Sequence, residues 1–133
     1  MAKHDIPVSD KLVRDTILTA NDGYESMKQL IMTKKLPTAI FCGNDTVAMG
    51  VMKALDEAGI SVPQDTSIVG FDNIDTSVYL KPTLTTIDIP KKELGRLAVK
   101  VLLDRLSSNR QYSIRVTIPF SLLVRGSCRA ITR

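Results

Sequence analysis

The chain has 133 residues, of which 44% are hydrophobic and 24% are charged, and its formal net charge at pH 7 is +4. This length and composition are typical of one globular domain with a hydrophobic core, and they exclude a disordered chain. No apolar run approaches the roughly 20 residues of a membrane helix, and the first residues lack a hydrophobic secretion signal, so we expect a cytoplasmic protein with no membrane contact.

Strand-like and helix-like apolar patterns alternate through the first half of the chain. Helical spacing of apolar residues marks each helix, and short apolar runs bounded by turn residues mark the strands. The expected elements are a strand at 11–17, a helix from 21–23 to about 35, a strand at 38–42, a helix at 45–58 and a strand at 67–71. Short connections between these elements predict right-handed parallel crossovers and a three-layer α/β/α sandwich with a mainly parallel sheet.

The second half of the chain contains a helix that needs an external partner. The expected elements are a loop at 73–82 with one helical turn near 77–80, a strand at 84–89, a helix at 91–106 and, after a linker at 107–110, an edge strand over 114–125 that Pro119 interrupts. The helix at 91–106 carries apolar residues over too broad a face to be left in water. No other segment of the chain is available to cover it, so we expect a homodimer or a domain-swapped assembly.

The charge and the cysteines do not indicate a nucleic-acid interface or a metal site. Lys and Arg are scattered, and three Tyr, three Phe and no Trp are too few for a base-stacking surface. Cys42 and Cys128 have no CxxC spacing, and His4 is the only histidine. We therefore expect two free thiols and predict neither a metal site nor a cofactor.

Polar side chains follow two of the predicted strands, at the point where each strand ends. Asn44 comes after the strand at 38–42, and Asp72 comes directly after the strand at 67–71. Ligands of open α/β sheets bind at the carboxyl edge, so the pair predicts a site for a polar small molecule. Taken singly, Asn44 could cap the following helix and Asp72 could start a turn. Asp45 and Asp75 are nearby but are typical of capping and solvated loop positions, so no catalytic residue is assigned.

Three segments in this order resemble the effector-binding region of the LacI/GalR family of bacterial transcription regulators. They are residues 37–50 (PTAIFCGNDTVAMG), 62–73 (VPQDTSIVGFDN) and 82–90 (PTLTTIDIP), the last followed by Leu94 and Gly95. The resemblance covers essentially the whole chain, and it implies a type I periplasmic-binding-protein-like fold built from flavodoxin-like subdomains.

The family pattern implies that this chain is an incomplete, C-terminal part of the effector-binding domain. Residues 1–87 would belong to the C-terminal subdomain, residues 88–111 would form the crossover strand and helix of the N-terminal subdomain, and residues 112–133 would return and form the tail. The helix-turn-helix headpiece would be absent, so the protein would contact DNA only through that missing part.

The resemblance also implies three effector-contacting residues, Asn44, Asp72 and Leu18. Position 18 is often aromatic in the family and lies against the ligand ring, whereas here it is leucine, which could also be an ordinary core residue. The leucine favours a sugar or related polar effector over a flat nucleobase. An alternative function is that of a sugar-binding transport protein with the same fold, which a secretion signal would distinguish.

Overall fold

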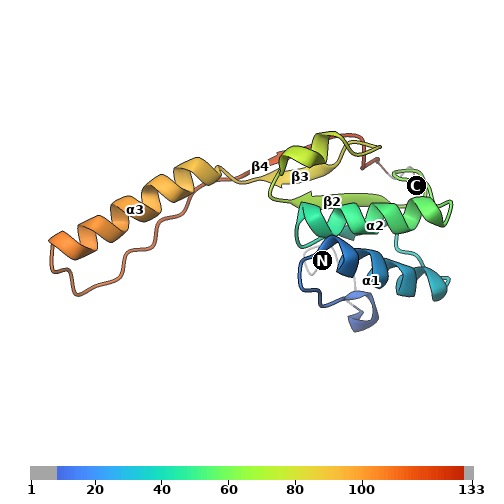
Figure 1. Cartoon of the computed structure of the whole chain (residues 1–133), viewed down its shortest axis with the longest axis horizontal. Helices are drawn as coiled ribbons and strands as arrows, with labels where there is room; N and C mark the ends of the chain where they lie inside the picture. Colours follow the sequence, from blue (N-terminus) through green and yellow to red (C-terminus); the bar gives the residue numbers. More distant parts are fainter. Residues whose placement is uncertain (1–8, 131–133) are drawn as a thin grey trace.

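A computed structural model of the chain describes residues 9–130 as an α/β body with one projecting helix (Figure 1). The helices are α1 (Ala20–Met32), α2 (Asp45–Glu57) and α3 (Lys91–Ser107), with 3₁₀ turns η2 (Asp10–Leu12) and η3 (Asp75–Val78). The strands are β1 (Ala39–Phe41), β2 (Ser67–Phe71), β3 (Thr85–Asp88) and β4 (Ser121–Leu123).

The four strands form one sheet in the order β1-β2-β3-β4. β1, β2 and β3 are parallel, and β4 pairs antiparallel with β3, so the predicted mainly parallel α/β sheet is confirmed. Two strand predictions were too long or wrong. Residues 11–17 contain the end of η2 and irregular backbone, and within 114–125 only Ser121–Leu123 pairs. A strand needs a hydrogen-bonding neighbour, and among the described residues neither 11–17 nor the part of 114–125 outside β4 has a strand partner.

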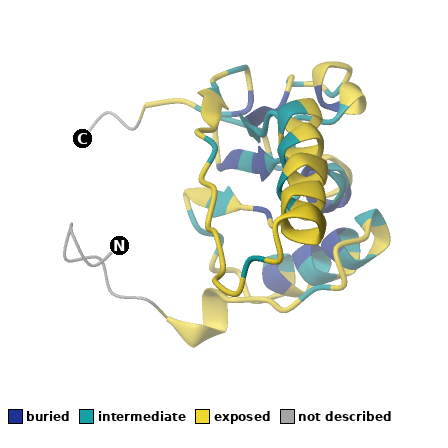
Figure 2. Ribbon diagram, turned by 90° about the vertical axis from the view of Figure 1, so that its left-hand side faces the viewer, coloured by how far each residue is buried: buried dark blue, intermediate teal, exposed yellow. Residues whose placement is uncertain are grey.

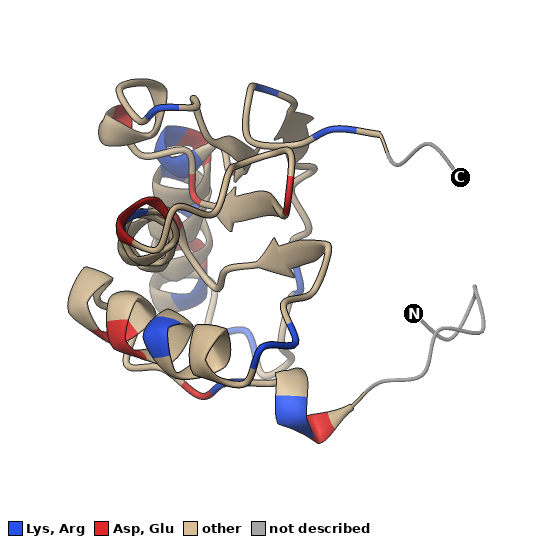
Figure 3. Ribbon diagram, turned by 90° about the vertical axis from the view of Figure 1, so that its right-hand side faces the viewer, with Lys and Arg blue, Asp and Glu red and all other residues tan. Residues whose placement is uncertain are grey.

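Helices α1 and α2 pack on the same face of the sheet, as the views from two sides show (Figures 1 and 3). The described residues therefore form two layers of the expected sandwich. The core lies between them and is almost fully buried, with Met27 and Leu30 from α1, Leu55 from α2 and Ile68 from β2. Helical periodicity places the side chains of α1 and α2 on the inner faces of these helices, and hydrophobic burial holds the two layers together.

The two helices contact each other directly through backbone at two glycines. A Cβ atom at Gly50 of α2 would overlap the carbonyl oxygen of Ala20, and one at Gly23 of α1 would overlap the carbonyl oxygen of Val47. Only glycine permits so close an approach, so α1 and α2 are joined without side chains between them at these points.

Helix α3 projects away from the body and contains no buried residue (Figures 1 and 2). Leu102 is 57% exposed and Leu106 is 74% exposed. The chain reaches α3 through β3 and comes back through β4, so these paired strands connect the arm to the body. The division of the chain at residues 88 and 112 stays a prediction. No helix within residues 9–130 is long and apolar enough to span a bilayer.

Candidate functional site

Asn44 and Asp72 leave the sheet at the same edge. The parallel register pairs Phe41 of β1 with Val69 of β2, and positions 44 and 72 each follow three residues later. The strands therefore bring to one edge two residues that are 28 positions apart in the sequence, as their spacing predicted.

Asn44 is the N-cap of α2. Its Oδ1 accepts a hydrogen bond of 2.8 Å from the backbone N–H of Val47, and its Nδ2 donates one of 3.3 Å to the carbonyl oxygen of Leu18. The capping role considered from the sequence is thus correct, and it does not use the full hydrogen-bonding capacity of the side chain. A side-chain amide carries two donor hydrogens and two acceptor lone pairs, so one donor and one acceptor of Asn44 remain available.

Leu18 lies beside Asn44 at the entry to α1. Its backbone adopts φ of 63°, its side chain is 50% exposed, and its Cδ2 lies 3.1 Å from the position of a Cβ built on Gly43. The alternative of a core leucine is therefore wrong, because this side chain stands at the surface of the edge that carries Asn44.

Asp72 occupies an unusual backbone conformation, with φ of 106°. Its N–H donates to the carbonyl oxygen of Ile87 at 3.0 Å, and its carbonyl oxygen accepts from Nζ of Lys91. Within the described part of the chain, its carboxylate has no hydrogen bond or ion pair. The backbone bends at Asp72, and the bend presents a carboxylate without a protein partner at the sheet edge.

Left-handed backbone is concentrated at this edge. The described residues include five non-glycine residues with positive φ, and three of them are Leu18, Asp72 and Asn73. Each such residue costs about 1 kcal/mol or more, and strained residues gather at functional sites. Asp and Asn tolerate positive φ better than most residues, so the Asp72–Asn73 pair was a sequence signal, whereas the leucine at position 18 gave none.

Asp45 is a structural residue that sequence reasoning misjudged. It was expected to cap a helix, but it is the first residue of α2 and is fully buried. Its Oδ1 accepts from Oγ1 of Thr86 at 2.6 Å, and its Oδ2 accepts from the N–H of Ile74 at 2.9 Å. Gly70 makes room for this carboxylate, because a Cβ there would overlap Oδ1. Asp45 therefore joins α2, β3 and the loop that follows Asp72.

Cys42, the residue that follows β1, is buried, and its thiol is unreactive. Burial, and secondarily the negative charge of Asp45, raises the pKa of Cys42 to about 12. A thiol with so high a pKa stays protonated at neutral pH and is a poor nucleophile. Cys128 is also free.

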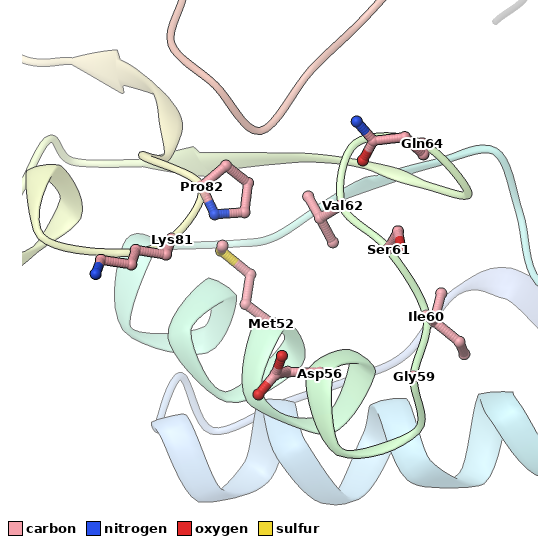
Figure 4. A pocket seen from close by; sticks show the side chains of 9 residues that line it. All are labelled: Met52, Asp56, Gly59, Ile60, Ser61, Val62, Gln64, Lys81 and Pro82. Atoms are coloured by element: carbon pink, nitrogen blue, oxygen red, sulfur yellow. The ribbon is translucent and has the colours of Figure 1, made fainter.

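Two hollows of similar size lie at different distances from the site. One, of about 320 Å³, is mainly apolar and is lined by Leu12, Cys42 and Gly43, the neighbour of Asn44. The other, also about 320 Å³, lies at the far end of α2, between Met52, Ile60 and Pro82 (Figure 4). Asn44 begins α2, so the second hollow is at the opposite end of that helix and does not include the candidate site.

The sequence of the chain matches a known family of domains. The family of periplasmic binding protein-like domains matches residues 1–128. The HTH-type transcriptional repressor PurR of Photorhabdus laumondii is 41% identical over 122 residues, which are 92% of this chain and 36% of that protein.

Two solved structures are similar in fold and sequence. A LacI family transcriptional regulator of Enterococcus faecium with bound ribose is 38% identical with a TM-score of 0.75, over 85% of this chain and 41% of that one. The lac repressor dimer bound to operator and the anti-inducer ONPF is 33% identical with a TM-score of 0.82, over 88% of this chain and 41% of that one.

The sheet, the helices on it and the polar edge define an α/β domain of the periplasmic-binding-protein type. The chain belongs to the family of periplasmic binding protein-like domains, and the resemblance to LacI/GalR regulators is confirmed. It spans about a third of the length of the curated relatives that it matches.

Proposed function

We propose that this chain is the effector-sensing portion of a cytoplasmic LacI-family transcription regulator and that its effector is a sugar or a similar polar small molecule. The main support for the proposal is that Asn44 and Asp72 lie at one edge of the parallel sheet, with Leu18 beside Asn44. The similar E. faecium regulator has ribose bound, which supports a polyhydroxylated ligand.

The available polar atoms match the hydrogen bonds that a sugar offers. The carboxylate of Asp72 accepts hydrogen bonds from two hydroxyl groups, and the remaining donor and acceptor of Asn44 serve hydroxyl groups in either role. Leu18 offers an aliphatic surface in place of an aromatic ring, so stacking contributes less than it would with an aromatic residue at this position.

The proposal can be tested by NMR with ribose as the probe and adenine as the flat aromatic comparison. Small-molecule sites bury most of the ligand, and the described residues supply one wall, so we expect binding too weak for calorimetry. Ribose should shift the amide resonances of Gly43, Asn44 and Asp72, and Asp72→Asn should remove these shifts. Ribose-induced shifts confined to the far end of α2, or their absence with an intact spectrum, would refute the proposal.

The parent regulator would transmit effector binding to DNA by a change between two global states. An effector biases such an equilibrium only through its different affinity for the two states. The relatives are transcriptional repressors, and one of them is a dimer on its operator, so a DNA-binding regulator that forms a homodimer is favoured over a transport protein or an enzyme.

A further inference from the structure

The side chain of Asn73, the residue after Asp72, lies between two opposite charges. Its Nδ2 donates to Oδ1 of Asp88 at 2.9 Å, and its Oδ1 accepts from Nη2 of Arg125 at 2.7 Å. The two charges fix the orientation of the amide. The backbone of Asn73 has φ of 50°, a conformation that asparagine tolerates better than most residues. Position 73 thus needs a short side chain with both a donor and an acceptor.

Arg125 holds this amide from the segment that follows β4. Its Nη1 donates to Oγ of the buried Ser77 at 2.8 Å and to the carbonyl oxygen of Leu84 at 2.9 Å. Its backbone N–H donates to Oγ1 of Thr85 at 2.9 Å. The guanidinium therefore serves three acceptors at once, including Asn73, and its planar fork is fixed in place.

The exit segment toward α3 contacts the same pair of residues. Asp88 is the last residue of β3, and Lys91 is the first residue of α3. Nζ of Lys91 donates to the carbonyl oxygens of Asp72 and Asn73. Since β3 leads out to α3 and β4 leads back (Figure 1), both connections to the arm are hydrogen-bonded to the residues at the candidate site.

We propose that Asn73 and Arg125 are positioning residues that couple the effector site to β3 and β4, the two strands that connect the body to α3. The proposal rests on the proposed function, in which Asp72 contacts the effector. A ligand that pulls on the Asp72 carboxylate displaces the adjacent Asn73, and the Asn73 amide passes that displacement to β3 through Asp88 and to β4 through Arg125. By linkage, the factor by which the effector changes the equilibrium between two arrangements of β3 and β4 equals the ratio of its affinities for those two arrangements.

The first test needs no ligand and compares Arg125→Ala with Arg129→Ala in the full chain by amide hydrogen exchange. Arg129 is the matched control, because its guanidinium binds the carbonyl oxygens of Pro63 and Gln64, in another loop. We expect Arg125→Ala to speed exchange at Asp72 and Asn73 roughly tenfold relative to the control. Equal exchange in the two variants would overturn the positioning role.

A conservative variant covers the case in which Arg125→Ala does not fold. Arg125→Lys keeps the charge but cannot serve three acceptors with a planar fork, so it should reproduce much of the faster exchange. Asn73→Asp provides a second comparison, since it keeps an acceptor for Arg125 and places a carboxylate against Asp88. Asn73→Asp should speed backbone amide exchange more at Asp88 than at Arg125, and the reverse order would contradict the proposed geometry.

The second test follows ribose-induced shifts in the wild-type chain and in Asn73→Ala. In the wild type, ribose should shift Asp72 together with Lys91 and Leu122. In Asn73→Ala, the shift at Asp72 should need roughly tenfold more ribose, and the shifts at Lys91 and Leu122 should disappear. Retention of those distant shifts would refute the coupling. A wild-type chain that does not respond to ribose would refute the proposed function, and the exchange experiment would then decide the positioning role.

Discussion

Asp45 is a buried carboxylate whose two oxygens hold groups from different segments. Asp45→Ala would leave the N–H of Ile74 and the hydroxyl of Thr86 without a partner, and each buried unsatisfied group costs about 1–3 kcal/mol. We expect the free energy of unfolding to fall by about 3 kcal/mol, measured by urea denaturation. Asp56→Ala, at an exposed position of the same helix, is the control and should change it by less than about 0.5 kcal/mol. A similar small effect of Asp45→Ala would mean that the tie to the loop is not formed.

Cys42 predicts a specific dependence of stability on pH. The ordinary pKa of the thiol is 9.0, and in the native state it is about 12. Between these values the unfolded chain has lost the thiol proton while the native state retains it, so raising the pH favours unfolding. The difference in unfolding free energy between the wild-type protein and Cys42→Ala should not depend on pH below about pH 8. Above about pH 9 the wild-type protein should lose stability steadily relative to the variant. Urea denaturation at several pH values measures this, and parallel curves for the two proteins up to about pH 11 would contradict the raised pKa.

At the scale of elements, two substitutions at the N-cap of α2 distinguish the structural role of Asn44 from its proposed role in ligand binding. Asn44→Ala removes the cap and should cost about 1 kcal/mol in unfolding free energy. Asn44→Asp keeps an acceptor for the N–H of Val47 and should retain the stability of the helix, but it removes the amide donor. We therefore expect Asn44→Asp to fold like the wild type and to lose the ribose-induced shifts, with Asn21→Asp on the exposed side of α1 as the control.

Local signals predicted the elements that depend mostly on their own residues. Asn44 and Gly59 bracket α2 as expected, with Gly59 in the left-handed conformation at its end. The strand expected at 11–17 failed because its apolar pattern does not encode a pairing partner, and β strands form only against one. The candidate site was only partly predictable. Strand order brings Asn44 and Asp72 to one edge, but the burial of Asp45 and the φ of Leu18 are set by contacts distant in sequence.

At the scale of the molecule, α3 presents leucines to solvent on an arm that the body does not cover. Apolar area of this extent stabilises association when it is buried, so we expect the isolated chain to self-associate through α3 at micromolar concentration. Leu102→Glu combined with Leu106→Glu should give a monomer in size-exclusion chromatography with light scattering. Lys53→Glu, on α2, should leave the assembly unchanged, and a wild-type monomer at this concentration would contradict the prediction.

The glycine contacts between α1 and α2 have a consequence for how ligand preference can evolve. Gly23 and Gly50 bring α1 and α2 into backbone contact. Leu18 at the entry to α1 and Asn44 at the start of α2 therefore lie on one closely packed helix pair. Under the proposed function, exchanges at position 18 would alter which molecule is recognised without moving the Asn44 amide, so selectivity would diversify through one side chain while the helix pair is unchanged.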